Sequence, residues 1–233
     1  MKIRILILLS FIFCVAQAQK PEQRAEVTLQ TTQGKIVLAL YNQTPLHRDN
    51  FLQKVKEGYY DGILFHRIIE KFMIQSGDSA SRAVSASMYF PSEKEDTTRI
   101  PAEFRFPELF HRRGVLAAAR EGDEVNPERA SSNSQFYIVW GKYFGPKDMR
   151  EMQEKVNERE NPDCRVTFPK EVIDAYEIDG GTPHLDGNYT VFGEVIKGLD
   201  VVGTIQAVKT DSLDRPIKDV RIKRAWISKP LQK

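Results

Sequence analysis

The chain has 233 residues, of which 41% are hydrophobic and 28% are charged, a composition typical of folded globular proteins and unlike that of disordered or collagen-like chains. Thirty-four Lys and Arg against 32 Asp and Glu give a formal net charge of +2, too small for a protein that binds by neutralising many phosphates. We therefore expect no nucleic-acid partner.

The first 18 residues have the pattern of a secretory signal peptide. Lys2 and Arg4 precede an apolar stretch of about 12 residues, and the small residues of Ala16-Gln17-Ala18 suit cleavage after Ala18. The stretch is too short to cross a bilayer. We therefore expect residues 1–18 to be removed and residues 19–26 to form a short tail. The mature protein is predicted to be exported, periplasmic or secreted, without stable membrane insertion.

The next part of the chain predicts a hairpin, a helix and two further strands. Apolar residues alternate from Val27 to Leu40 around a turn at Gln33-Gly34, which indicates two paired strands. Thr44-Pro45 supplies an N-cap and a first-turn proline, and apolar residues at helical spacing predict a helix over about 45–57. Apolar runs over 63–69 and 72–74 predict strands.

Farther along, four more strands are predicted over 115–119, 136–139, 191–195 and 220–227, with a second helix over 199–205. Helical patterns over 147–160 and 169–176 predict that the segment of about 142–180 is helical. Many short strands with two helices far apart in sequence indicate a mainly β fold, a closed antiparallel β-barrel capped by two helices. This domain is expected to span 27–228, followed by a C-terminal tail at 229–233.

One motif is denser than the rest, running Phe-His-Arg-Ile-Ile-Glu-Lys-Phe-Met-Ile-Gln-Ser-Gly-Asp from Phe65 to Asp78. It resembles the signature of the cyclophilin family of peptidyl-prolyl cis-trans isomerases. Ser-Asn-Ser-Gln-Phe-Tyr-Ile at 132–138 and Leu-Asp-Gly-Asn-Tyr-Thr-Val-Phe-Gly at 185–193 resemble two further family blocks, in the same order. The likeness extends over about 27–227.

This resemblance implies an isomerase that assists the folding of exported proteins, a monomer that binds proline-containing polypeptides and needs no cofactor. Against the family pattern, the segment of about 142–180 is an insertion of roughly 40 residues before Leu-Asp-Gly, beyond ordinary loop lengths. A second possibility remains, a proline-binding or holdase module that uses the same groove with little turnover.

Two residues are predicted to be catalytic. Rotation about an Xaa-Pro bond faces a barrier of about 18–20 kcal/mol, because conjugation holds the amide planar. A fixed cationic donor stabilises the twisted amide more than the planar one and so lowers that barrier. Arg67 is the candidate, since its guanidinium keeps its charge at any relevant pH. Gln75, on the returning strand, is expected to hold the guanidinium through its amide oxygen.

The resemblance also implies a set of substrate-binding residues: Phe72, Met73, Ala119, Arg120, Gln135, Tyr137, His184, Leu185 and Tyr189. Taken one at a time, such residues usually belong to a core or a solvated face, and only their joint spacing favours a groove. His184 stands where many cyclophilins have a tryptophan that binds cyclosporin, so weak cyclosporin binding is predicted. The four histidines lack the spacing of a zinc site, and no metal is expected.

Overall fold

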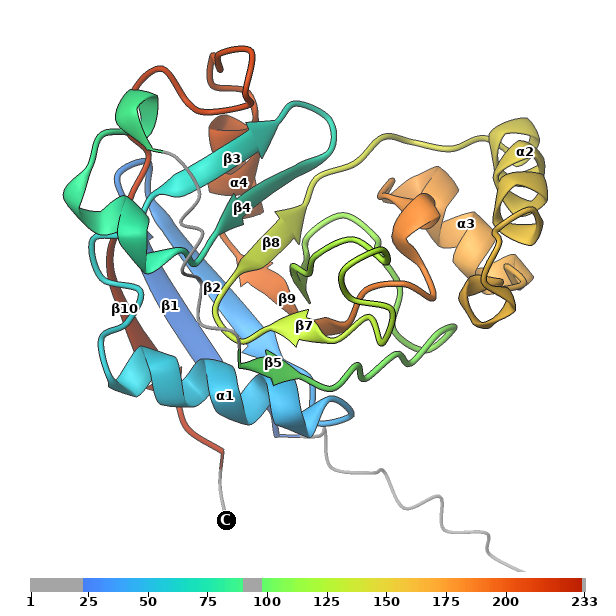
Figure 1. Cartoon of the computed structure of the whole chain (residues 1–233), viewed down its shortest axis with the longest axis horizontal. Helices are drawn as coiled ribbons and strands as arrows, with labels where there is room; N and C mark the ends of the chain where they lie inside the picture. Colours follow the sequence, from blue (N-terminus) through green and yellow to red (C-terminus); the bar gives the residue numbers. More distant parts are fainter. Residues whose placement is uncertain (1–22, 90–97, 232–233) are drawn as a thin grey trace, which may run out of the picture.

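The computed structural model describes residues 23–89 and 98–231. The predicted signal peptide and the first half of the predicted N-terminal tail, residues 19–22, lie outside the described residues. Eight strands form one antiparallel sheet in the order β10-β1-β2-β9-β6-β8-β4-β3 (Figure 1). These strands are β1 (Glu26–Thr31), β2 (Lys35–Leu40), β3 (Phe65–Ile69), β4 (Met73–Ser76), β6 (Val115–Ala118), β8 (Phe136–Val139), β9 (Val191–Lys197) and β10 (Ile222–Lys229). The strands predicted from the alternating pattern are confirmed.

A separate pair of very short strands, β5 (Arg99–Ile100) and β7 (Ser131–Ser132), was not predicted. Two residues are too few to show an alternating pattern, and the pairing joins segments 30 residues apart in the chain. It sits beside the main sheet, close to the loop that leads into β8 (Figure 1).

The main sheet is a strongly curled, open half-barrel, so the prediction of a closed barrel is wrong. Its two edge strands are β3 and β10, and an isolated bridge between Leu64 and Arg221 joins their starting ends. Farther along, the outer edge of β3 is covered by a loop, because the Ile68 N–H donates to the Asp214 carbonyl at 2.8 Å. A loop therefore occupies the position in which a closing strand would pair, and it protects the exposed edge.

The helices α1 (Pro45–Lys56) and α4 (Leu199–Gln206) cover the sheet, as predicted. Helix α1 packs on β9 and β10, whereas α4 packs on β2, β3 and β4. Phe51 of α1 and Val202 of α4 belong to the same buried core as the inward residues of the strands. Thr44 is the N-cap residue, but among the described residues its side chain makes no capping bond. Instead the Glu103 carboxylate accepts from the backbone N–H groups at the start of α1.

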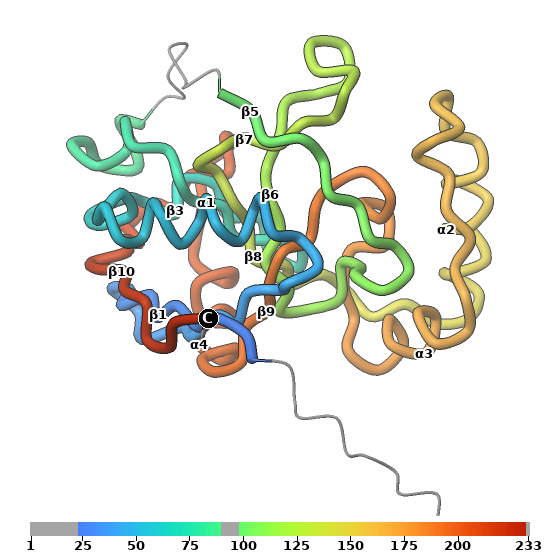
Figure 2. Tube along the Cα trace, turned by 90° about the horizontal axis from the view of Figure 1, so that it is seen from below, coloured from blue at the N-terminus to red at the C-terminus, as the bar shows by residue number. Residues whose placement is uncertain are grey.

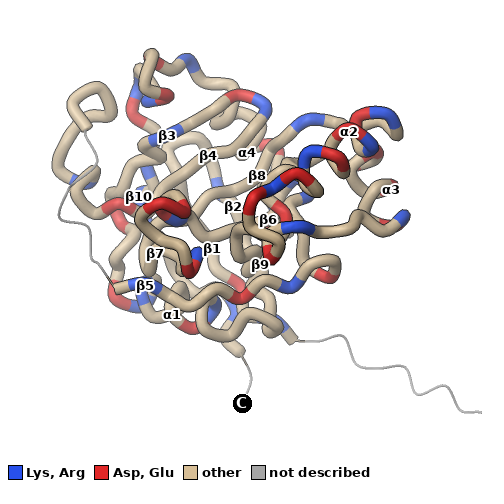
Figure 3. Tube along the Cα trace, turned by 45° about the vertical axis from the view of Figure 1, so that its right-hand side comes forward, with Lys and Arg blue, Asp and Glu red and all other residues tan. Residues whose placement is uncertain are grey.

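The helices predicted in the segment 142–180 are present as α2 (Pro146–Asn157) and α3 (Lys170–Ile178). They lie together at one side of the sheet, away from β10 (Figure 2). They share a small core of their own, formed by Met149, Val156, Phe168, Val172 and Tyr176 with Phe106 and Phe110 from the loop before β6. Positive and negative residues alternate along α2, so neither sign gives a broad patch there (Figure 3).

Candidate active site

Outward-facing residues of four neighbouring strands form one row across the curled sheet. Arg67 of β3 is in register with Gln75 of β4, Gln75 with Tyr137 of β8, and Tyr137 with Ala117 of β6. Successive side chains of a strand point to opposite faces, so the flanking residue Ile74 joins the central core, whereas Tyr137 and Ala117 belong to an apolar cluster on the other face. The alternating pattern thus places a cation, an amide and an aromatic ring on one surface.

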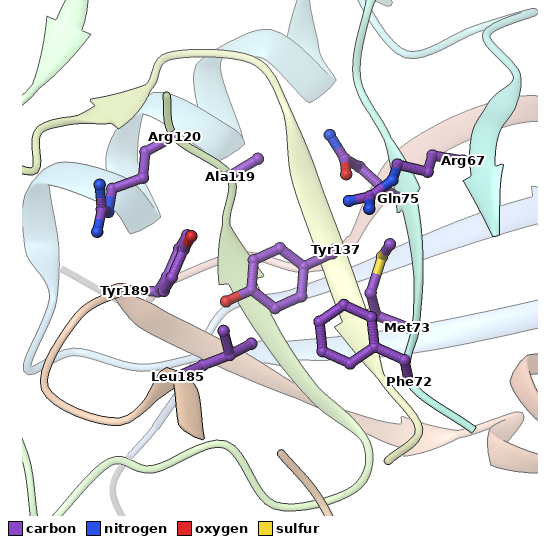
Figure 4. Close-up of a pocket in the computed structure, with 9 residues that line it drawn as sticks. All are labelled: Arg67, Phe72, Met73, Gln75, Ala119, Arg120, Tyr137, Leu185 and Tyr189. Carbon is purple, nitrogen blue, oxygen red and sulfur yellow. The ribbon is translucent and has the colours of Figure 1, made fainter. Parts of the chain in front are cut away.

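This outer face holds an open cavity of about 210 Å³ (Figure 4). Its lining residues are Arg67, Phe72, Met73, Gln75, Ala119, Arg120, Tyr137, Leu185 and Tyr189. All of them were singled out in the sequence, whereas Gln135 and His184 lie outside the lining. In the close-up, Arg67 and Gln75 lie on one side of the Tyr137 ring and Arg120 and Tyr189 on the other (Figure 4). The cavity is therefore an apolar slot between two cations.

The Arg67 guanidinium has a different partner from the one predicted. Its Nε lies 3.4 Å from Oδ2 of Asp214, and about half of each side chain is exposed. The Gln75 amide instead donates through Nε2 to Oε1 of Gln135 at 2.8 Å, so Gln135 contacts a lining residue without lining the cavity itself. Asp214 was missed because it lies in a turn with no periodic pattern. The left-handed backbone of Asp214, with φ of 60°, is seen only in the structure.

Arg120 closes the other side of the slot, and all three nitrogens of its guanidinium already donate hydrogen bonds within the protein. Its Nε donates to the Asn188 carbonyl at 2.9 Å, its Nη1 pairs with Asp123 at 2.6 Å, and its centre lies 4.6 Å from the centroid of the Tyr189 ring. The Ala119 N–H is already bonded to the Gln135 carbonyl at 3.0 Å. Arg120 therefore acts here as a rigid wall that holds Tyr189 against the cavity.

His184 does not line the cavity but packs against Phe72, which does. The imidazole ring stacks on Phe72, with 5.4 Å between ring centroids and an interplanar angle of 27°. The surrounding protein lowers the pKa of His184 to about 4, chiefly by desolvation, although part of the residue reaches solvent. At neutral pH the ring is uncharged, which suits packing against a phenyl face.

Most of the chain matches a known family. The family model for cyclophilin type peptidyl-prolyl cis-trans isomerases matches residues 26–227. The chain belongs to the cyclophilin family. A peptidyl-prolyl cis-trans isomerase of Staphylococcus aureus (strain USA300) is 32% identical over 209 residues, which are 88% of this chain and 94% of that protein.

A longer relative shares one part of its length with this cyclophilin. A bifunctional phosphatase/peptidyl-prolyl cis-trans isomerase of Streptococcus pyogenes is 36% identical over 200 residues, and the match spans 84% of this chain but only 37% of that protein. The solved cyclophilin of Cryptosporidium parvum has a TM-score of 0.61 at 24% identity, over 90% of this chain and all of that one. This structural likeness shows the fold.

Within residues 23–89 and 98–231, no three His, Cys, Asp or Glu side chains gather closely enough to hold a metal ion. In the same part of the chain, every helix is too short or too polar to span a membrane. The buried Cys164 has no cysteine partner there and accepts from the Arg129 guanidinium at 3.0 Å.

We expect His66 to make the stability of this cyclophilin depend on pH. The residue is only 6% exposed, and burial lowers its pKa to about 4, whereas an unfolded chain has a His pKa of about 6.5. Between these values the unfolded chain binds more protons, so the free energy of unfolding falls as the pH drops, by about 3 kcal/mol in total. Urea unfolding of wild type and His66→Gln between pH 7 and 4 checks this. A variant with the same pH slope as wild type would contradict it.

Proposed function

We propose that this cyclophilin accelerates rotation about Xaa-Pro bonds by holding proline in the outer cavity beside Arg67. One observation supports this most directly: a permanently charged guanidinium stands at the rim of an apolar slot of about 210 Å³. Phe72, Met73 and Leu185 supply apolar contacts for the proline ring, and soft or aromatic side chains can accept both isomers. Asp214 and the row of paired strands keep the guanidinium near this position.

The chemistry requires no bond to break. As the amide twists, conjugation is lost, and the nitrogen and the carbonyl oxygen each become better hydrogen-bond acceptors. A donor already in place strengthens its interaction at that moment, and each 1.36 kcal/mol gained is tenfold in rate. Arg67 needs no change of protonation to do this, since guanidinium remains charged. We therefore expect no titrating acid or base in the catalytic step.

The alternative is a holdase that binds proline-containing chains with little turnover. The two functions differ in stoichiometry, because a catalyst acts at a small fraction of the substrate concentration and a holdase must be present in equal amount. NMR exchange spectroscopy of a short Xaa-Pro peptide tests this. Faster cis-trans exchange with substoichiometric protein supports the isomerase. Binding without faster exchange would leave the holdase.

We propose further that the protein is exported and that proline-containing segments of exported proteins are its substrates. The N-terminal signal pattern supports this. The paired strands β1 and β10 extend to Glu26 and Lys229, one residue beyond each end of the predicted domain of 27–228. After cleavage, 34 minus 2 leaves 32 basic residues against 32 acidic ones, so recognition depends on the apolar cavity more than on net charge. Expression in a bacterial host and N-terminal sequencing should give Gln19 as the first residue, and an intact Met1 would argue against export.

The segment 142–180 is proposed to be an addition of roughly 40 residues to the family fold. Its helices form a core that is separate from the central one, which supports an origin as an added unit. The insertion enters shortly after β8, which carries Tyr137, and ends shortly before Leu185. Both ends of the segment therefore adjoin the proposed proline pocket.

A substitution at His184 tests the predicted weak binding of cyclosporin. Tryptophan at this position would present an indole N–H and a larger apolar face beside Phe72, on which the histidine ring now stacks. We expect His184→Trp to bind cyclosporin at least about tenfold more tightly than wild type, the change given by one good hydrogen bond. Fluorescence titration measures the two dissociation constants. Equal affinities would show that this position does not decide cyclosporin binding.

A further inference from the structure

Behind the cavity, a chain of buried side chains links the pocket wall to α3. The Tyr137 hydroxyl lies 3.0 Å from Nε2 of His111, and Nδ1 of His111 lies 2.7 Å from Oδ1 of Asp186. The other carboxylate oxygen of Asp186 accepts from the Tyr176 hydroxyl at 2.5 Å. Tyr137 lines the cavity, whereas Tyr176 belongs to α3 in the segment 142–180. Side chains from four separate parts of the sequence thus form one continuous path.

The donors and acceptors along this path follow from the chemistry of its members. Burial raises the pKa of Tyr137 and of Tyr176, and the Asp186 charge adds to both effects, so both hydroxyls keep their protons. A carboxylate can only accept hydrogen bonds, so Nδ1 of His111 carries a hydrogen and donates the bond to Asp186. Nε2 of the same ring then faces the Tyr137 hydroxyl at 3.0 Å. These bonds hold the Tyr137 ring in one orientation.

The path is also buried. His111 and Asp186 are each 1% exposed, Tyr176 is fully buried and Tyr137 is 5% exposed. Inside a protein such bonds are stronger than in water, and a buried partner left without its bond is costly. Asp186 receives a further bond from the His111 backbone N–H at 2.8 Å. The loss of any one member should therefore shift its neighbours instead of being compensated by solvent.

A second connection joins the segment 142–180 to the same rim of the pocket. Arg159, which follows the end of α2, donates to the carbonyl of His184 at 2.7 Å and to that of Asp186 at 2.8 Å. Leu185, which lines the cavity, lies between these two residues. The backbone that carries Leu185 is thus held by Arg159, just after α2, and the ring of Tyr137 is held through Tyr176 of α3.

We propose that Tyr176 is a positioning residue for the proline pocket: through Asp186 and His111 it fixes Tyr137, so the segment 142–180 sets the affinity of the pocket for proline. This rests on the proposed function of the cavity. Tyr176 touches no substrate and acts through three other side chains. A purely structural role for Tyr176 would lower stability without any dependence on the Tyr137 hydroxyl.

A double-mutant cycle separates these two roles. Tyr176→Phe, Tyr137→Phe and the double variant each remove hydroxyls while keeping every ring. We expect Tyr176→Phe to weaken the affinity for an Xaa-Pro peptide about three- to tenfold in the wild-type background and to have little further effect beside Tyr137→Phe. The cis-trans exchange rate of the saturated complex should change much less, because Arg67 is untouched. The His111 imidazole ¹⁵N signals should shift in both single variants.

A matched control is available elsewhere in the fold. The Tyr89 hydroxyl donates to the buried carboxylate of Asp78 at 2.5 Å, the same kind of bond as that of Tyr176, but Tyr89 does not line the cavity. Tyr89→Phe should lower the free energy of unfolding by a similar amount and leave the His111 signals in place. Chemical denaturation of both variants makes this comparison.

The outcomes are distinct. An equal loss of affinity from Tyr176→Phe in both backgrounds, or no loss in wild type, would overturn the positioning role. If wild type binds the peptide without speeding exchange, the isomerase function fails while the coupling is still measured from affinities. If wild type does not bind the peptide at all, the cavity is no proline pocket and both proposals fall.

Discussion

Replacing Arg67 with alanine is expected to lower kcat/KM for an Xaa-Pro peptide about a hundredfold or more. Removing one preorganised donor from a catalytic site typically costs a factor of about 10² to 10³ in rate. The Arg67 guanidinium lines the cavity, and its strand is in register with β4 at Gln75. The proposed mechanism uses no titrating acid or base. Exchange spectroscopy on wild type and variant, under equal conditions, measures the effect.

Two controls show whether the loss comes from the cation. Arg67 is 46% exposed, and its pair with Asp214 is worth at most about 1 kcal/mol in such a setting, so the variant should fold. Asp214→Asn breaks the same ion pair but keeps the cation, and its loss of activity should be far smaller. Arg67→Lys keeps the charge without the planar fork and should fall between wild type and alanine. Equal activity in wild type and Arg67→Ala would contradict the proposed mechanism.

Replacing Gly77 with alanine is expected to lower the free energy of unfolding by about 3–5 kcal/mol, among the largest effects of a single substitution. Gly77 has φ of +111°, a conformation that side chains rarely adopt, and an added Cβ would lie 2.2 Å from the Ser134 carbonyl oxygen. Gly77 directly follows β4 and Ser134 lies just before β8, and these two strands are paired, so neither backbone can move without disturbing the sheet. Urea unfolding gives the difference directly.

The matched control is Gly122→Ala, the same chemical change at an open position. An added Cβ there meets nothing within 4 Å, and the backbone is outside the left-handed region. Its effect should stay within about 1 kcal/mol, with a small gain possible because alanine restricts the unfolded chain. A Gly77 variant as stable as the Gly122 variant would show that the loop before β8 can adjust, and the close approach would then not be essential.

Local pattern was sufficient to predict most of the fold. The alternation of apolar residues in β3, β4 and β8 separates the core face from the face that bears Arg67, Gln75 and Tyr137. This works because a strand has a period of two and a helix a period of 3.6, so the buried face can be read from the order of residues. Of the nine lining residues, four lie in these strands, Arg67, Met73, Gln75 and Tyr137, whereas the other five lie in turns and loops and were expected only from the family resemblance.

Only the tertiary structure shows which distant side chains complete the site. Asp214 reaches Arg67 because the loop before β10 covers the edge of β3, and that same loop leaves the sheet open instead of closed. Glu103 caps α1 in place of Thr44, and Tyr176 reaches Tyr137 through His111 and Asp186. By itself the sequence determined the elements and their buried faces, because these depend on neighbours along the chain. The partners of Arg67 and Tyr137 depend on the paths of loops through space, for which no local periodicity exists.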